Sequence, residues 1–196
     1  MEVFILLAVF AYLLGSIPFG YIIPKLHGVD IRTIGSKATS TTNVSRALGW
    51  RWALLSGLLD VVKGFIPAYL AVLYLSNEWQ IIAVCLLPVI GHVFPVWLKF
   101  KGGRGATPYF GATLVLVGLK FFLLSFIIWI LAVIFTRIMS LSNIIYPWIL
   151  AVLIYFFFPF HYFIYGILGA LLITIALREN IKRLIQGVEP KVSFKW

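Results

Sequence analysis

The stretch ATPYFGATLVLVGLKFFLLSFIIWILAVIF, residues 106–135, decides how many times this chain crosses a membrane. A helix needs roughly 20 apolar residues to cross the hydrocarbon core, so this run is too long for one ordinary crossing. It is either one long helix or two shorter ones that part near Gly118-Leu119-Lys120, where a glycine precedes a lysine. The charges in the rest of the chain distinguish these two arrangements.

The composition of the whole chain points to a membrane protein. Of its 196 residues, 62% are hydrophobic and only 11% are charged, and the mean hydropathy is +1.05. Soluble domains are about half apolar and about a quarter charged, so a soluble globule, a coiled coil and a disordered tail are excluded. The single cysteine, Cys85, excludes a disulfide within the chain. We therefore expect an all-α polytopic membrane protein.

Apolar segments and their boundaries predict one membrane-embedded domain over residues 1–196. The first segment follows Glu2 rather than a basic region and has no small-residue cleavage site, so we expect it to remain as a span. The predicted spans are residues 3–23, 52–75, 81–98, 106–117, 120–136, 141–158 and 162–177, followed by a cytoplasmic tail at 178–196.

The basic residues favour a break within 106–135. Sixteen Lys and Arg stand against six Asp and Glu, a net charge of +10. If the run is two helices, the loops at 24–51 and 99–105, the loop at Arg137 and the tail lie on one side, and the cation-free Ser76-Asn77-Glu78 loop lies on the other. Cytoplasmic loops carry an excess of Lys and Arg. We therefore expect about seven transmembrane helices, with the N-terminus outside and the C-terminus in the cytoplasm.

The first basic loop is rich in hydroxyl groups. Five of the seven residues from Ser36 to Thr42 are Ser or Thr, and Asn43 and Arg46 follow. These groups suit a phosphate, and Asn43 is a candidate cap for a short helix whose N–H groups favour an anion. The alternative interpretation is a solvated loop whose cations only hold it in the cytoplasm.

The second polar cluster joins His92 to the segment Lys99-Phe100-Lys101-Gly102-Gly103-Arg104-Gly105. Glycines around an Arg allow backbone amides to approach an oxyanion, as in an anion nest. Lys101 and Arg104 add charge, and His92 is able to pass a proton or donate to an anion. A purely structural histidine is the alternative.

Three further features of the sequence concern its charged and polar residues. Asp60 and Lys63 are three residues apart in one predicted span, and the spacing predicts a mutual salt bridge. The segment 178–187 has the pattern of an amphipathic interfacial helix. The histidines lack the spacing of metal ligands, and no soluble segment is long enough for a nucleic-acid-binding module. We expect no metal, no cofactor and no nucleic-acid partner.

The order of these clusters resembles the bacterial acyl-phosphate:glycerol-3-phosphate acyltransferases, the PlsY family. The resemblance covers nearly the whole chain. It rests on Ala11-Tyr12-Leu13-Leu14-Gly15-Ser16-Ile17-Pro18-Phe19-Gly20, Thr42-Asn43-Val44-x-Arg46, Asp60-Val61-Val62-Lys63-Gly64, Gly91-His92-x-Phe94-Pro95, Phe100-Lys101-Gly102-Gly103-x-Gly105, Ser140-Leu141 and Arg178-Glu179-Asn180-Ile181-x-Arg183-Leu184.

The resemblance implies that an acyl group passes from acyl phosphate to the 1-hydroxyl of sn-glycerol 3-phosphate. The products are lysophosphatidate and phosphate, in the first step of phospholipid synthesis. It also implies an enzyme among membrane lipids of the bacterial inner membrane, with its site facing the cytoplasm. For the oligomeric state we expect a monomer. The residues it assigns are His92, Ser36 and Ser140 as catalytic residues, and Thr42, Asn43, Arg46, Lys101, Gly102, Gly103, Arg104 and Asn180 for the substrates.

The first loop departs from the family pattern, which usually has glycines and an asparagine where this chain has Lys37, Ala38, Ser40 and Thr41. Two alternatives to the enzyme therefore stand. One is a divergent paralogue of low or no activity with a binding or regulatory role, and the other is a carrier of phosphorylated or lipid anions. If the protein is an enzyme, either His92 or the phosphate of the substrate itself takes the proton of the attacking hydroxyl.

Overall fold

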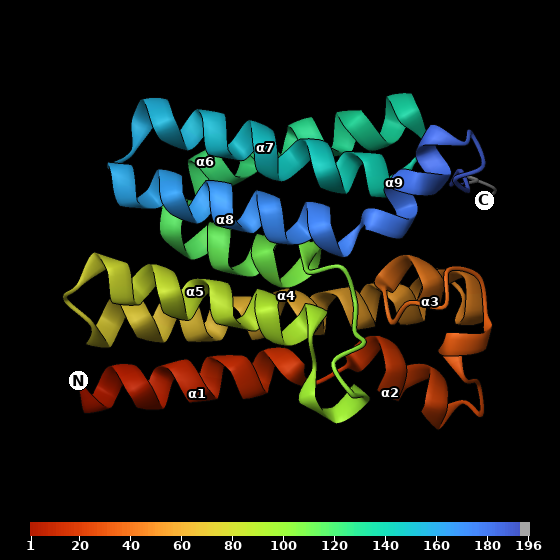
Figure 1. Cartoon of the computed structure of the whole chain (residues 1–196), viewed down its shortest axis with the longest axis horizontal. Helices are drawn as coiled ribbons and strands as arrows, with labels where there is room; N and C mark the ends of the chain where they lie inside the picture. The colour runs from red at the N-terminus through yellow and green to blue at the C-terminus, as the bar shows by residue number, and fades with distance from the viewer. Residues whose placement is uncertain (193–196) are drawn as a thin grey trace. The chain divides into compact units, whose positions relative to one another are not determined.

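A computed structural model describes residues 1–192 and contains helices but no strand in that range. The last four residues of the predicted tail, 193–196, lie outside the described residues. The elements are α1 (Glu2–Ser16), α2 (Phe19–Leu26), η1 (Ile31–Thr33), α3 (Thr41–Leu48), α4 (Trp50–Tyr74), α5 (Glu78–Val93), η2 (Val96–Leu98), α6 (Ala106–Thr136), α7 (Met139–Phe157), α8 (Phe160–Ala176) and α9 (Arg178–Ile185) (Figure 1).

The chain forms two compact units, which we call unit 1 (Met1–Leu116) and unit 2 (from Val117 onward). The boundary lies beside Gly118, whose left-handed φ of 73° interrupts the helical path of α6. A glycine adopts this φ without a Cβ clash, which is why the run breaks here. The predicted break near Gly118 is confirmed.

The helices are long and apolar enough to cross a membrane. By length and composition, five candidate spans lie in the described residues, and a sixth is counted if the bent pair α8–α9 is one span. The count reaches seven only if α6 is divided at Gly118. A polytopic helical membrane protein is therefore confirmed, and the seven-span count stays a prediction.

Two predicted spans are less regular than expected. The first is divided at Ile17-Pro18 into α1 and α2, because Pro18 has no N–H to continue the helical ladder. The predicted span ends at residue 23, but Pro24 lies inside α2, which continues to Leu26. The third span is α5 followed by the short helix η2, with Pro95 between them.

The outward faces of the helices are apolar. Leu6, Leu58, Ile127, Val152 and Leu171 are all exposed, with 42–71% of their surface accessible. Apolar patches of this extent are unusual on a soluble monomer. Lipid tails accept such side chains, so this surface fits a multi-pass membrane protein.

Unit 1 is held together by α1, α4 and α5, which contact one another. Gly91 of α5 lies so close to Tyr12 O of α1 that a side chain at this position would collide with the backbone. Small residues allow this approach, as in many membrane helix pairs. Figure 1 shows α2, α3 and the segment after α5 gathered at the end of unit 1 opposite the N-terminus. Most of the predicted site residues lie there.

Candidate functional site

Asn43 organises the first polar loop. It is completely buried, and its Nδ2 donates to the carbonyl oxygens of Ile31, Ile34 and Ala38 at 3.1, 2.9 and 3.1 Å. Its Oδ1 accepts from the backbone N–H of Ser36 at 3.3 Å. The Asn43 amide is therefore occupied by the backbone of the loop. Its observed contacts position Ser36 rather than leave the amide open to a substrate.

The helix after this loop is capped by a different residue from the one expected. Ser40 is the N-cap of α3, and its hydroxyl accepts from the backbone N–H of Asn43 at 3.4 Å. The prediction that Asn43 caps the helix is wrong, because its side chain points back into the loop. Thr42 follows in the first turn of α3 and is half-buried.

Arg46 lies at the other end of α3 and is exposed. Its side chain passes Gly35, where a built Cβ would lie 3.4 Å from Arg46 Cδ. Within residues 1–192, the Arg46 guanidinium forms no ion pair with a carboxylate. Arg46 is thus an available cation beside the hydroxyl-rich loop.

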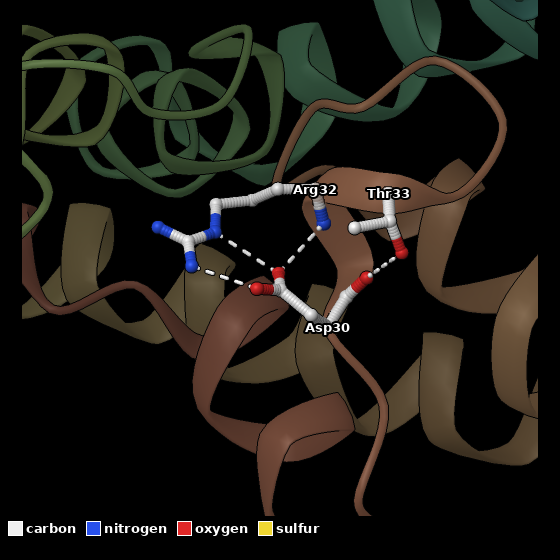
Figure 2. A network of polar contacts seen from close by, with 3 residues as sticks. All are labelled: Asp30, Arg32 and Thr33. Carbon is white, nitrogen blue, oxygen red and sulfur yellow. Dashed lines mark hydrogen bonds and ion pairs between the residues drawn. The ribbon is translucent and has the colours of Figure 1, made fainter.

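Arg32, in the same loop, behaves differently. Figure 2 shows its guanidinium paired with Asp30, with Nε donating to Oδ1 at 2.9 Å and Nη2 donating to Oδ2 at 2.7 Å. These hydrogen bonds, with those from the Arg32 backbone and its charge, lower the pKa of Asp30 to about 2. The pair closes the turn at η1, where Thr33 Oγ1 also donates to Asp30 O at 2.9 Å. Arg32 therefore has a structural role.

The glycine segment after η2 packs on the end of α5. The N–H of Gly103 donates to His92 O at 2.9 Å, and that of Gly102 donates to Val93 O at 3.1 Å. This differs from the expected anion nest, because backbone carbonyls already occupy both amides. The segment instead presents side chains, with Lys101 exposed and Arg104 half-buried.

A buried charged cluster lies beside this segment. Lys63 Nζ is 2.9 Å from Asp60 Oδ1, and both side chains are at most 1% exposed. This confirms the salt bridge predicted from the spacing in α4. His92 Nδ1 of α5 is 3.6 Å from the same carboxylate oxygen. Sequence reasoning missed this third member, because His92 comes from another helix.

An apolar groove lies at the break between α1 and α2. It has a volume of about 390 Å³ and is lined by Ile17, Pro18, Tyr21, Ile22, Trp97 and Leu98. The last two residues belong to η2, which directly precedes the Lys99–Gly105 segment. The groove therefore lies next to basic residues. The sequence signal for it was Pro18, which interrupts an otherwise apolar span.

Unit 2 contains the remaining predicted residues, Ser140 and Asn180, which share one partner. Ser140 Oγ and Asn180 Nδ2 donate to Glu189 Oε1 at 2.8 and 2.7 Å. Arg183 Nε donates to Glu189 Oε2 at 2.7 Å. Burial alone would raise the pKa of Glu189, but these three hydrogen bonds and the Arg183 charge hold it below its ordinary value. Sequence reasoning missed Glu189; its signal was that it is one of two glutamates in a basic tail.

The predicted residues thus fall into two sets. Within unit 1, Figure 1 shows the first loop and the glycine segment at one end, and the backbone of His92, in the last turn of α5, accepts from Gly103 of that segment. Within unit 2 it brings Ser140 and Asn180 together around Glu189.

Comparisons with known proteins agree over nearly the full chain. Residues 5–187 match the family model described as glycerol-3-phosphate acyltransferase. A glycerol-3-phosphate acyltransferase of Aquifex aeolicus is 41% identical, covering 93% of this chain and 96% of the relative. One of Ehrlichia canis is 36% identical, with coverage of 98% and 100%.

Two crystal structures are also similar. One is PlsY, an integral membrane glycerol 3-phosphate acyltransferase, in its glycerol 3-phosphate form. It matches with a TM-score of 0.93 and 38% identity over 97% of this chain and 96% of that chain. The lysophosphatidic acid form matches with a TM-score of 0.90 and 37% identity, covering 97% and 95%.

Proposed function

Since the chain belongs to the glycerol-3-phosphate acyltransferase family, we propose that it acylates the 1-hydroxyl of sn-glycerol 3-phosphate with an acyl phosphate as donor. The observation that carries this proposal is the match to the glycerol 3-phosphate form of an integral membrane acyltransferase over 97% of the chain. The chain is a multi-pass membrane acyltransferase of glycerol 3-phosphate. The donor, the position acylated and the residues below are the proposed part.

The proposed reaction needs no covalent intermediate on the protein. The hydroxyl oxygen of glycerol 3-phosphate attacks the carbonyl carbon of the acyl phosphate, and the ester bond forms as the bond to the phosphate oxygen breaks. The hydroxyl proton passes to a base, and inorganic phosphate leaves. The mixed anhydride is already activated, so positioning and charge stabilisation are sufficient.

We assign the phosphate of glycerol 3-phosphate to cationic side chains. Arg46 and Lys101 are exposed and have no carboxylate partner within residues 1–192. A guanidinium is able to grip a phosphate with two parallel hydrogen bonds. Arg104 adds a third cation from the glycine segment. In unit 2, the assignment of Asn180 to glycerol 3-phosphate rests on the family resemblance.

The acyl phosphate is assigned to the first loop and the groove. Ser36 and Thr42 supply hydroxyl donors for its phosphate, and the contacts of Asn43 set the position of Ser36. The apolar groove beside Ile17 and Trp97 offers a place for the acyl chain, since it joins an apolar lining to a basic segment. Gly102 and Gly103 are assigned an indirect role, because their close packing on α5 positions the segment that carries Lys101 and Arg104.

We assign the role of the base, which takes the hydroxyl proton of glycerol 3-phosphate, to the phosphate group of the acyl phosphate. His92 is only 6% exposed, and its ring lies between Asp60 and Gly103, so a substrate hydroxyl has little access to it. We therefore give His92 a positioning role. Ser140 is oriented by Glu189 and is assigned to the reacting groups from unit 2.

The loop charges support the orientation in the membrane. We place the N-terminus outside, the C-terminus in the cytoplasm and the site facing the cytoplasm of a bacterial inner membrane, with α6 counted as two spans. The basis is the collection of cations in the first, third and last polar segments. Water-soluble glycerol 3-phosphate and the phosphate group of the donor would then meet at the inner surface, where the acyl chain of the product remains in the membrane.

The test is acyl transfer by the purified protein in detergent. Acyl phosphate, acyl-CoA and acyl-carrier protein are each supplied with glycerol 3-phosphate, and lysophosphatidate and free phosphate are measured. Of the three donors, we expect only acyl phosphate to give lysophosphatidate and free phosphate, and to give them in equal amounts. Turnover with acyl-CoA and none with acyl phosphate would overturn the proposed donor.

The alternatives make different predictions. A carrier would move labelled glycerol 3-phosphate across vesicles that contain the protein, without releasing phosphate. A binding paralogue would bind glycerol 3-phosphate without turnover. The family match and the two similar structures favour neither.

A further inference from the structure

The Asp60–Lys63 pair lies wholly inside unit 1 and has no evident access to substrate. Both side chains are buried in α4, which is one of the candidate membrane spans. Charged residues in a span are rare and costly, and a hydrophobic pair of similar volume often serves stability equally well. The presence of this pair in a span therefore calls for a role besides stability.

One end of the pair reaches the groove. Lys63 Nζ donates to the carbonyl oxygen of Ile17 at 2.9 Å. Ile17 is the residue between α1 and α2, and it lines the apolar groove together with Pro18. The lysine is thus tied to the backbone that shapes this wall.

The other end reaches the glycine segment. Asp60 Oδ1 faces His92 Nδ1 at 3.6 Å, and the opposite edge of the ring, Nε2, lies against Gly103. A Cβ at Gly103 would collide with this edge, so the segment fits only around the ring as it is oriented. The Gly103 N–H also donates to His92 O at 2.9 Å. The orientation of His92 therefore sets the position of the segment that carries Lys101 and Arg104.

We propose that Asp60 and Lys63 are positioning residues for both substrates, with Lys63 holding the groove wall at Ile17 and Asp60 holding His92 against the glycine segment. The inference rests on the proposed function, which assigns the groove to the acyl donor and the segment to glycerol 3-phosphate. Neither residue touches a substrate. Both act through the groups they hold.

The central test is a pair of matched double variants, D60N/K63M and D60V/K63M. Both remove the two charges together, which avoids an uncompensated buried charge. They differ at position 60, where asparagine keeps a polar amide toward His92 Nδ1 and valine does not. S56A, which removes a buried hydroxyl one turn away on α4, is the control. Thermal unfolding and elution in detergent establish that each protein is folded.

The kinetic parameters separate positioning from stability. We expect both double variants to raise the KM for acyl phosphate at least threefold, because both lose the contact to Ile17. Only D60V/K63M is expected to raise the KM for glycerol 3-phosphate at least tenfold, while D60N/K63M stays within threefold of the parent. S56A is expected to keep parental values. Folded double variants with equal and parental KM values would overturn the proposal.

A replacement variant and a binding measurement test the proposal if a double variant does not fold or if the protein does not use acyl phosphate. If D60V/K63M does not fold, G103A replaces it, because its Cβ displaces the segment from the other side of the ring. A folded G103A with the parental KM for glycerol 3-phosphate contradicts the proposal. Binding of glycerol 3-phosphate by calorimetry is measured in parallel. If the parent binds it but does not use acyl phosphate, the proposed donor fails, and the binding constants of the variants still test the positioning of the segment.

Discussion

The side-chain amide of Asn180 donates to the carboxylate of Glu189 at 2.7 Å. The same carboxylate accepts from Ser140 and Arg183, so one acid joins α7, α9 and the segment that follows α9. The backbone of that segment is attached as well, because Val192 N–H donates to Arg137 O at 2.7 Å. Glu189 therefore fixes the orientation of two residues that we assign to the substrates.

Glu189 predicts a pH dependence of stability. Its folded-state pKa is lowered by its hydrogen bonds, in spite of burial, from an ordinary value of 4.5. A lowered pKa contributes stability above the unfolded-state value, and the contribution is lost as the pH falls through the folded-state value. Position 189 does not titrate in the variant E189Q. At neutral pH we expect this variant to lose about 1 kcal/mol of the free energy of unfolding, because its hydrogen bonds no longer involve a charged carboxylate.

Thermal unfolding of the parent and E189Q from pH 7 to pH 3 checks this prediction. The difference between their midpoints should be largest at neutral pH and shrink in acid below an ordinary glutamate pKa of about 4.5. E179Q is the control, because Glu179 is half-exposed and pairs with Lys182 on the surface of the same helix. A constant difference at every pH would show that the carboxylate charge of Glu189 has no such role.

The left-handed backbone conformation of Lys37 predicts that replacing it with glycine raises the stability of the protein. Its φ of 57° lies in the left-handed region, which an L side chain occupies at a cost of about 1 kcal/mol. Glycine relieves this strain, so K37G should raise the free energy of unfolding by up to about 1 kcal/mol. G35A tests the reverse case two residues earlier, because Gly35 has a φ of 52° and its Cβ would meet Asn43 Oδ1. Chemical unfolding that ranks K37G below the parent would contradict the argument.

Features set by local spacing could be predicted from the sequence. Asp60 and Lys63 share a helix face because they are three residues apart, and the pair forms as predicted. The break at Gly118 followed from the length of an apolar run and the charges on either side. Both inferences need only the geometry of one helix and the thickness of a bilayer.

Features that depend on the path of the folded backbone could not be predicted in this way. Asn43 meets three carbonyls of its own loop, and which polar group a buried amide finds depends on the path of the folded backbone. Ser140 meets Glu189 across 49 positions of sequence. The amides of Gly102 and Gly103 suited an anion by composition, but α5 supplied competing carbonyls.

The division of α6 at Gly118 predicts the sides of two exposed positions. Between Ser76 and Gln186 the chain crosses the membrane four times if α6 is one span and five times if it is two. We therefore expect cysteines at these positions, placed singly in a C85A background, to react from opposite sides of the membrane. The measurement is labelling by a membrane-impermeant maleimide in intact cells and in inverted vesicles. Labelling of both from one side would make α6 a single span.

The sharpest prediction contrasts two arginines of the polar segment between α2 and α4. Arg46 is exposed, has no carboxylate partner within residues 1–192, and is assigned to the phosphate of glycerol 3-phosphate. Lysine preserves its charge but not the planar fork that grips two phosphate oxygens. Losing a charge-assisted hydrogen bond costs roughly 1.5–3 kcal/mol. R46K should therefore lower kcat/KM for glycerol 3-phosphate by about ten- to a hundredfold.

R32K is the matched control, because the fork of Arg32 already binds Asp30 through two hydrogen bonds. It should weaken the η1 turn and leave kcat/KM within about threefold of the parent. The two variants carry the same chemical change in the same polar segment between α2 and α4 and preserve the same net charge, so membrane insertion should be equal. Folded R46K with the parental kcat/KM would make Arg46 a topology residue and remove it from the site. An equal loss in both variants would assign the effect to the loop rather than to phosphate recognition.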